Sequence, residues 1–322
     1  MEVKIRPERG SDYFPVADIY LQSFADVFGP AEYVCETVLM DIYRHAPTFD
    51  PELSLVAEVD GEVVGHILFF PHPMKLSGEN VQAVFLAMMG VLPRWQKQGI
   101  GGRLISTGLD IARQKGGDIS LVLGHSKYYP RFGYKPDMFG ECWVEVEREN
   151  LVLPDNLEVA PVRAVHVPQL QKMWDVWHGR SDLAIIPGDS IVDWATYAKH
   201  VAASVFMMDG HVCGYARYDR GNPQQPGCVL ADSPGSARAV LAWLLQRPEA
   251  HSAGQIKVPV HPDSAVAREW LEGKSHTRRW DASMAMVLNP ACRAAVDYVR
   301  EVEAKKRPIG LMIWPAVVTS AE

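Results

Sequence analysis

The order of apolar and polar positions predicts a mixed α/β chain. Residues 53–71, LSLVAEVDGEVVGHILFFP, form two β-rich runs around Asp60-Gly61, a dipeptide that tolerates positive φ and is a strong hairpin signal. Residues 81–93 are apolar on both faces, which is typical of a central strand, and Pro93 ends that strand. Apolar residues then recur at helical spacing from Gly99 to Gly116.

Further elements complete one α/β unit over residues 1–150. Residues 3–12 predict a strand and a loop, with Ser11 or Asp12 capping the helix that follows. Three later segments are expected as a buried strand, an aromatic-rich short helix or turn, and a final strand: residues 118–124, 126–136 and 141–149.

The second half repeats this order of elements. A proline-containing linker at residues 150–156 is followed by a strand and helix at 157–177 and by a hairpin at Asp209-Gly210. Strands and helices then alternate over five segments: 228–232, 236–247, 254–260, 264–273 and 281–289. We therefore expect a second copy of the same fold over residues 151–290. Residues 291–322 are expected to form a C-terminal helix and an apolar tail that docks on a domain or on a second subunit.

Composition narrows the class of protein. The chain has 322 residues, 48% hydrophobic and 22% charged, and its net charge of −7 argues against a nucleic-acid-coating protein. Five scattered cysteines without a CxxC pair favour reduced thiols, and no zinc spacing occurs, so we expect no metal. No secretory signal or membrane-length apolar run is visible, which predicts a soluble, cytoplasmic protein with no membrane contact.

A glycine-rich helix start, QKQGIG at residues 96–101, is the strongest chemical signal. Glycines at 99 and 101 allow close approach of a phosphate to the backbone, while free N–H groups, the helix dipole and Lys97 favour negative charge. A dinucleotide fingerprint fails because Leu104 stands where its third glycine belongs, and no Walker GK[ST] follows. A diphosphate cradle and a plain strand-to-helix turn both remain open from these residues alone.

Two spaced motifs resemble the GCN5-related N-acetyltransferase (GNAT) superfamily. Gln96, Gly99 and Gly101 match the [QR]-x-x-G-x-[GA] of motif A, and YYPRFGY at residues 128–134 is similar to the FYxxxGF motif. Within the superfamily the chain looks like bacterial proteins of the YhbS type. The resemblance implies two tandem GNAT-like domains, each with a mixed central sheet flanked by helices. It also implies acetyl-CoA as co-substrate.

The resemblance also implies site residues. The pantetheine arm would bind Met89, Gly90 and Val91. The pyrophosphate would bind amides from Gln96, Lys97, Gln98, Gly99, Ile100 and Gly101, with Gly102 continuing the surface. An amine would then attack the thioester directly.

The resemblance identifies a general acid more clearly than a general base. Tyr129 corresponds to the superfamily's general acid, and its alternative role is aromatic packing against the cofactor. Many relatives have a Glu on the central strand as base, which this strand lacks. His125 is the candidate base, with a turn-capping role as its alternative. Glu141, Glu145 or a distant acid acting through water also remain open.

The second half lacks the glycine-rich segment and reads VLADSPGSARAVLAWL there, so we expect it to cover the acceptor cleft without binding CoA. Trp174, Trp177 and Trp194 are candidates for core or acceptor contacts. This arrangement is similar to the first two domains of Eis-type aminoglycoside acetyltransferases. We therefore predict an N-acetyltransferase for a small-molecule amine, with a homodimer possible. The alternatives are a protein or peptide amine acetyltransferase and a catalytically silent acyl-CoA-binding regulator.

Overall fold

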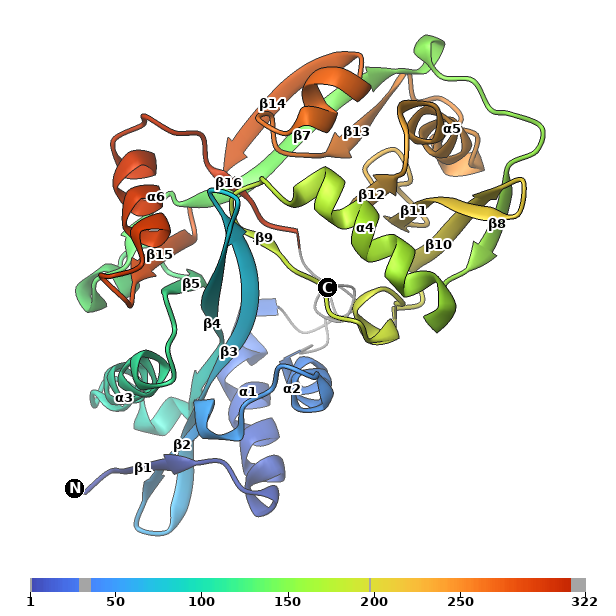
Figure 1. Ribbon diagram of the computed structural model, residues 1–322. Coiled ribbons are helices and arrows are strands. Elements are labelled where there is room, and N and C mark those ends of the chain that lie inside the picture. The colour runs from blue at the N-terminus through green and yellow to red at the C-terminus, as the bar shows by residue number, and fades with distance from the viewer. Residues whose placement is uncertain (1, 29–35, 197, 314–322) are drawn as a thin grey trace.

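The computed structural model describes residues 2–28, 36–196 and 198–313. Figure 1 shows two halves, with the N-terminal half built on one long twisted sheet and the other half on two smaller sheets. Helices pack against these sheets, so the predicted mixed α/β class is confirmed.

The first sheet has eight strands in the order β1-β2-β3-β4-β5-β15-β6, with β9 beside β3. Strands β4 and β5 are parallel, and the other pairs in this sheet are antiparallel. The strand bounds are β1 Lys4–Pro7, β2 Ser54–Val59, β3 Glu62–Leu76, β4 Glu79–Val91, β5 Ile119–Leu123, β6 Lys135–Pro136, β9 Ala184–Ile185 and β15 Ser283–Val287.

Two tight turns join the central strands. Asp60 and Gly61 have φ of 49° and 83° and connect β2 to β3, which confirms the predicted hairpin. Ser77 and Gly78 have φ of 56° and 81° and connect β3 to β4 in the same way. The sequence analysis missed this second hairpin, because Ser-Gly is a weaker turn signal than Asp-Gly.

Helices cover both faces of the first sheet. Helix α1 (Tyr13–Phe28) packs against Gly90, where a Cβ would lie 2.9 Å from Ile19 Cγ2. Helix α3 (Ile100–Gln114) packs on the opposite face, where a Cβ at Gly108 would lie 2.1 Å from Phe69 Cε2. Helix α2 (Glu36–His45), which was not predicted, lies beside α1. Helix α6 (Arg293–Glu303) matches the predicted C-terminal helix and packs against β15.

The predicted cap of the first helix is wrong. Asp12 ends a 3₁₀ turn, Gly10–Asp12, and its carboxylate accepts the Arg9 N–H at 2.8 Å. The same carboxylate pairs with the Arg6 guanidinium at 2.6 Å. Because Arg6 belongs to β1, its ion pair with Asp12 fixes β1 to the turn before α1.

The second half contains two four-stranded sheets. One has the order β12-β11-β10-β8, and the other has the order β13-β7-β14 with β16 beside β7. Helices α4 (Val167–His178) and α5 (Pro234–Leu245) pack against the first of these. The strand bounds are β7 Phe139–Glu147, β8 Glu158–Pro161, β10 Val201–Met208, β11 His211–Asp219, β12 Cys228–Ala231, β13 Gln255–Pro259, β14 Gly273–Arg279 and β16 Gly310–Leu311. Asp209 and Gly210, with φ of 49° and 83°, join β10 to β11 as predicted.

Strands are exchanged between the halves. β7, expected as the final strand of residues 1–150, pairs with β13 and β14. β15, expected as the last strand of residues 151–290, pairs with β5 and β6. Sheet boundaries therefore do not coincide with residue 150 or 290, and the division into domains at those residues stays a prediction.

Two further segments differ in detail from the sequence analysis. The helix expected over residues 264–273 is a single π turn, Val266–Trp270, which ends before β14 begins at Gly273. In the C-terminal segment, residues 309–313 are buried and β16 lies parallel to β7, so this part docks on its own chain. The rest of the predicted tail, residues 314–322, and Cys35 lie outside the described residues.

Candidate acetyl-CoA site

The two central parallel strands separate at a bulge. Pairing between β4 and β5 runs from Ala83 opposite Ile119 to Leu86 opposite Val122 and then stops. On the other side of β4, Phe69 faces Leu86 while Leu68 faces Met88, which makes Ala87 the extra residue of a β-bulge. Beyond the bulge, residues 88–91 pair with β3, and their β5-facing edge has no strand partner among the described residues. The predicted segment Met89, Gly90 and Val91 therefore lies on an open edge.

The glycine-rich loop leads from this edge into α3. Lys97 and Gly99 have positive φ, 60° and 82°, and Gly99 is the N-cap residue, without a side chain to cap the helix. The first helical hydrogen bond runs from the Arg103 N–H to the Gly99 carbonyl at 3.1 Å. The N–H groups of Gly99, Ile100, Gly101 and Gly102 therefore have no partner inside the helix. We call residues 96–102 the cradle.

The carbonyl of Val91 links the open edge, α1 and the cradle. It accepts hydrogen bonds from Ser23 Oγ at 2.9 Å and from Gln96 Nε2 at 3.0 Å. Gln98 Nε2 donates to the Arg94 carbonyl at 3.2 Å. The two glutamine side chains thus hold the loop. The Gln96 N–H donates to the Pro93 carbonyl at 3.3 Å, so the N–H groups at the helix start are the donors for a ligand.

An open hollow of about 480 Å³ follows the cradle along α3. It is lined by Ile5, Gly99, Gly102, Arg103, Ser106, Thr107 and Phe132. A Cβ at Gly99 would meet nothing within 4 Å, so the space over the helix start is free. The sequence analysis missed Arg103 and Ser106, although their spacing from Gly99 places them on one helical face. Backbone donors, a cation and hydroxyls suit the phosphates of CoA.

Tyr129 lies at the end of β5, across the gap from the open edge. It begins the 3₁₀ turn Tyr129–Phe132, which is the predicted aromatic turn, and it is 7% exposed. A Cβ at Gly124 would lie 2.5 Å from Tyr129 Cε2, so only glycine leaves room for this ring. Burial raises the pKa of Tyr129 to about 12, which keeps the phenol protonated at neutral pH.

The neighbouring tyrosines have different surroundings. Tyr134 is buried and shares a 2.7 Å hydrogen bond with Ser120, which makes it a core residue. Tyr128 is half-buried, and a Cβ at Gly101 would lie 3.0 Å from Tyr128 Oη. Its hydroxyl is therefore at the cradle, a closeness that the sequence motif alone did not reveal. The Arg131 guanidinium lies over the Tyr128 ring, 3.8 Å from the ring centroid.

The candidate bases do not all converge on this site. His125 is exposed, and its backbone carbonyl, rather than its ring, accepts the Tyr128 N–H at 2.8 Å. Glu141 and Glu145 lie on β7 in the other sheet, where they pair with Arg278 at 2.6 Å and with His276 at 3.1 Å. Their partners give these two carboxylates a structural role away from the open edge.

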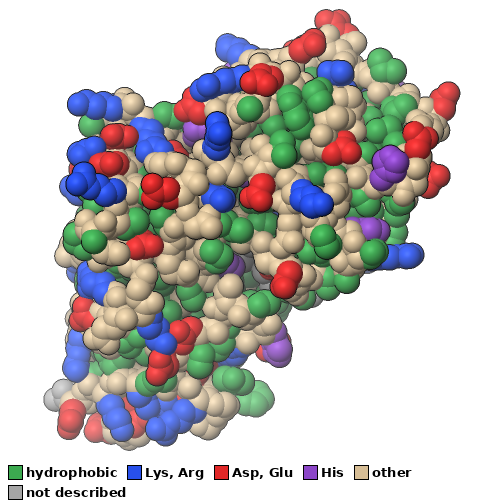
Figure 2. Space-filling model, viewed as in Figure 1, with side chains coloured by type: hydrophobic (Ala, Val, Ile, Leu, Met, Phe, Trp, Pro, Cys, Tyr) green, Lys and Arg blue, Asp and Glu red, His purple; other side chains and the backbone are tan. Residues whose placement is uncertain are grey.

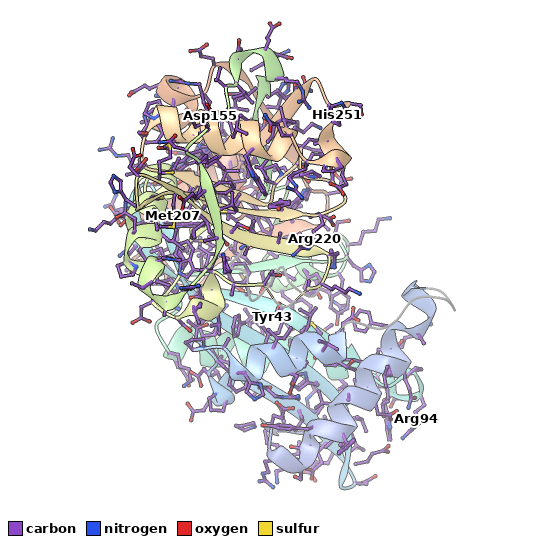
Figure 3. All side chains as sticks on the ribbon, turned by 90° about the vertical axis from the view of Figure 1, so that its right-hand side faces the viewer. Tyr43, Arg94, Asp155, Met207, Arg220 and His251 are labelled. Carbon is purple, nitrogen blue, oxygen red and sulfur yellow. The ribbon has the colours of Figure 1, made fainter. Side chains whose placement is uncertain are left out.

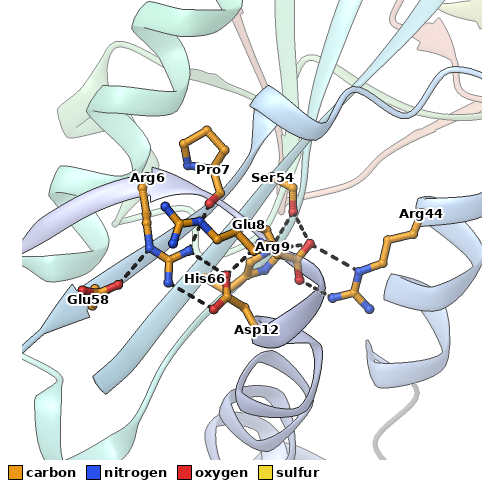
Figure 4. Close-up of polar contacts among 9 residues, drawn as sticks. All are labelled: Arg6, Pro7, Glu8, Arg9, Asp12, Arg44, Ser54, Glu58 and His66. Carbon is orange, nitrogen blue, oxygen red and sulfur yellow. Dashed lines mark hydrogen bonds and ion pairs between the residues drawn. The ribbon is translucent and has the colours of Figure 1, made fainter. Parts of the chain in front are cut away.

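A buried polar network lies behind the open edge (Figure 4). His66 of β3 stands opposite Gly90, with its Nε2 2.9 Å from Ser54 Oγ and its Nδ1 2.5 Å from Tyr20 Oη. Ser54 Oγ donates to Glu8 at 2.8 Å, and Arg44 also binds that carboxylate. Because the single Ser54 proton goes to Glu8, His66 Nε2–H donates to Ser54 and Nδ1 accepts from Tyr20.

This network fixes helices against the sheet. It joins the loop after β1, α1, α2, β2 and β3 through buried side chains. Burial lowers the pKa of His66 to about 3, with a smaller effect in the same direction from Arg44, so the ring is neutral. The network was not predicted, because residues that are bonded directly to each other are up to 46 residues apart in sequence.

The helix start in the second half is closed by its own side chain. The Ser236 N–H donates to Ser233 Oγ at 3.1 Å, which caps α5 where the first half has Gly99. Trp174, Trp177 and Trp194 are 4%, 0% and 2% exposed, so they belong to the core. Over the described ranges, no group of three or more His, Cys, Asp or Glu side chains could hold a metal ion. No described helix is both long and apolar enough to cross a membrane.

An open strand edge leads into a glycine-rich helix start, with a tyrosine across the gap, which is the arrangement that the predicted acetyl-CoA site requires. Residues 4–136 match the family model Acetyltransf_9, described as an acetyltransferase (GNAT) domain. This part of the chain is a GNAT acetyltransferase domain. The predicted resemblance is confirmed.

Named relatives agree with this family. The chain is 44% identical over 86 residues to the uncharacterized N-acetyltransferase YjhQ of Escherichia coli K12. The aligned region covers 27% of this chain and 48% of YjhQ. It is also 34% identical over 84 residues to the uncharacterized N-acetyltransferase YhbS of the same strain. This aligned region covers 26% of this chain and 49% of YhbS. The matches thus span about half the length of these relatives.

The fold likeness extends further than the sequence likeness. The crystal structure of a GCN5-related N-acetyltransferase from Kribbella flavida matches with a TM-score of 0.66 at 17% identity and covers 89% of this chain and 71% of that chain. At this identity the match shows the fold alone. It extends over both halves of the chain.

Proposed function

We propose that this protein is an acetyl-CoA-dependent N-acetyltransferase for the amine of a small molecule. The observation that carries the proposal is the meeting of three features at the end of β5: the open edge at residues 88–91, the cradle and Tyr129. Each feature fits one part of the co-substrate, namely the pantetheine arm, the pyrophosphate and the thiol.

The chain's backbone would hold the co-substrate. The open edge offers strand N–H and C=O groups of the kind that pair with an extended amide-containing arm. The cradle offers N–H groups and the positive end of the α3 dipole to the pyrophosphate. Arg103 and the hydroxyls of Ser106 and Thr107 add charge-assisted and neutral hydrogen bonds along the hollow.

The chemical step requires no covalent enzyme intermediate. An amine attacks the thioester carbonyl while both are held in one site, which removes much of the entropic barrier. Tyr129, protonated and next to the gap, donates its hydroxyl proton to the departing thiolate. His125 remains the predicted base from sequence, and its exposure favours proton exchange with water.

The position of the second half supports a small acceptor. Figure 3 shows Tyr43 of α2 at the boundary where the first sheet meets the second half. We propose residues 151–290 as a GNAT-like copy that covers the acceptor side. Acidic and basic side chains are interspersed over the face in Figure 2, which gives no support to a nucleic-acid partner.

Turnover with defined amines tests the proposal. CoA thiol release from acetyl-CoA would be measured with spermidine, kanamycin, tyramine, lysine and a lysine-containing peptide with a free N-terminus. Amine-dependent release with one of the small molecules, at kcat/KM above that for the peptide, is the expected result. A preference for the peptide would instead indicate a protein acetyltransferase. Binding of acetyl-CoA without any release would indicate the silent regulator.

A further inference from the structure

The hydroxyl of Tyr128 lies at the cradle without a hydrogen-bond partner among the described residues. An ideal Cβ at Gly101 would lie 3.0 Å from Tyr128 Oη, which places the hydroxyl against the first turn of α3. The two glutamine side chains of the cradle, in contrast, already donate to backbone carbonyls. The Tyr128 hydroxyl is therefore a side-chain donor that can bond a ligand at the helix start.

The same hydroxyl lies next to the open edge. The Cβ position of Gly101 is also 3.8 Å from Met89 Cε and 3.9 Å from Met89 Sδ, so Met89 and the Tyr128 hydroxyl both approach Gly101. Met89 belongs to the open edge, and Gly101 carries one of the N–H groups without a partner inside α3. The hydroxyl thus lies where the open edge meets the cradle.

Aromatic contacts hold the ring of Tyr128 in place. Its centroid is 5.3 Å from that of Tyr129, edge to face, and 5.6 Å from that of Phe132, which lines the hollow along α3. The Arg131 guanidinium stacks on the same ring. A ring restrained by these contacts loses little side-chain entropy when its hydroxyl bonds a ligand.

The charge around this hydroxyl favours an anion. Arg131 is exposed, and no carboxylate among the described residues pairs with it. Its positive charge acts in the same direction as the N-terminal end of the α3 dipole. A hydrogen bond from a neutral hydroxyl to an ionised phosphate oxygen is charge-assisted and stronger than a neutral one. The surroundings of Tyr128 Oη therefore suit a phosphate oxygen.

We propose that Tyr128 is a co-substrate-binding residue whose hydroxyl donates a hydrogen bond to a pyrophosphate oxygen of acetyl-CoA at the cradle. This inference rests on the proposed function. The FYxxxGF motif has phenylalanine where this chain has Tyr128, so the ring contacts do not require a hydroxyl. The hydroxyl adds a side-chain donor to the backbone N–H groups of the helix start, while proton transfer to the thiolate stays with Tyr129.

Removal of one hydroxyl tests this role. Tyr128→Phe keeps the ring and its contacts and deletes only Oη. Tyr134→Phe is the matched control, because the Tyr134 hydroxyl is bonded to Ser120 in the core. Calorimetry should show that Tyr128→Phe binds CoA about tenfold more weakly than wild type, whereas Tyr134→Phe binds it within threefold. Thermal unfolding would verify that each variant is folded.

Phosphorus NMR of bound CoA would identify the phosphate that the hydroxyl contacts. The pyrophosphate signals should shift between wild type and Tyr128→Phe, while the 3′-phosphate signal stays unchanged. Tyr134→Phe should give the wild-type spectrum. Neither this measurement nor calorimetry depends on turnover.

Three results would overturn the role of Tyr128: a loss of CoA affinity below threefold in Tyr128→Phe, an equal loss in Tyr134→Phe, or a spectral change confined to the 3′-phosphate. If wild type does not bind CoA, the proposed function fails and this inference fails with it. If Tyr128→Phe weakens CoA binding as expected but wild type acetylates no amine, the role of Tyr128 stands and only the transfer reaction fails.

Discussion

Gly124 supports the ring of Tyr129 so closely that a methyl group does not fit between them. A Cβ at position 124 would lie 2.5 Å from Tyr129 Cε2 and 3.3 Å from its Cζ. Gly124 follows β5 directly, and Tyr129 begins the next turn, so a small residue at the strand end fixes the place of the hydroxyl. The contact therefore connects a packing requirement to the proposed acid.

This contact predicts that Gly124→Ala behaves like Tyr129→Phe. Tyr129→Phe should lower kcat about 100-fold because the thiolate loses its proton donor, and Gly124→Ala should lower it at least tenfold by displacing the ring. Steady-state kinetics would measure both, with acetyl-CoA affinity expected to stay within threefold. The double variant should be no slower than Tyr129→Phe. Multiplied losses would show that Gly124 acts through something other than Tyr129.

Strand exchange predicts that residues 1–150 do not fold alone. Without β15 the edge of β5 is unpaired, and β7 has neither β13 nor β14. Such an exposed edge favours aggregation. Expression of this fragment should yield insoluble or unfolded protein under conditions where the whole chain is soluble. A monomeric fragment with cooperative thermal unfolding would contradict this expectation.

The buried ion pair between Asp182 and Arg307 predicts that replacement of Asp182 strongly lowers the stability of the fold. The Asp182 carboxylate accepts from Arg307 at 2.7 and 2.8 Å and from the Ser77 N–H at 2.8 Å, which joins the β3–β4 turn, the second half and the C-terminal segment. Asp182→Ala should lower the free energy of unfolding by about 2–4 kcal/mol, because it leaves Arg307 and Ser77 unpaired, with Arg307 still partly hydrated.

Thermal and urea unfolding would measure the effect of Asp182→Ala. Arg300→Ala is the control, since Arg300 pairs with Asp297 but is 64% exposed, and it should change stability by less than about 1 kcal/mol. Equal effects of the two substitutions would mean that the Asp182 pair contributes no more than a surface pair.

The burial of His178 without hydrogen-bond partners predicts that the fold loses stability at acidic pH. His178 is fully buried, both ring nitrogens lack partners, and burial lowers its pKa to about 3. The unfolded chain, with an ordinary histidine pKa near 6.5, therefore binds more protons between pH 3 and 6.5, and stability falls as pH falls through this window. The slope is about 1.4 kcal/mol per pH unit for one such group.

Comparison of wild type with His178→Leu would isolate this contribution. The variant removes no hydrogen bond, so its Tm at pH 7.5 should lie within a few degrees of wild type. Between pH 7.5 and 5.0 its Tm should fall less than that of wild type. Identical pH dependence of the two proteins would show that His178 is protonated without cost in the folded state.

Local signals predicted the elements that form the candidate site. Asp60-Gly61 determines a turn by its own backbone preference, and Gly99 marks a helix start for the same reason, so both could be read without tertiary information. The motif around Tyr129 likewise lies within one short segment. These features depend on neighbours in sequence.

Features that depend on distant partners could not be predicted. The alternation of β7 is the same whichever sheet it joins, so its pairing with β13 and β14 required the structure. Arg103 was overlooked because its role follows from the hollow beside α3, which no sequence pattern describes.

Acetyl-CoA binding by Gly99→Glu tests the cradle most directly, and α3 supplies a matched control at its other end. Gly99 and Gly116 have φ of 82° and 81°, and a Cβ at either would meet nothing within 4 Å, so a glutamate causes similar backbone strain at both positions. Isothermal calorimetry of wild type, Gly99→Glu and Gly116→Glu should show binding reduced at least about 30-fold, or roughly 2 kcal/mol, only in Gly99→Glu. Equal affinity in all three proteins would contradict the account and leave the cradle a strand-to-helix turn.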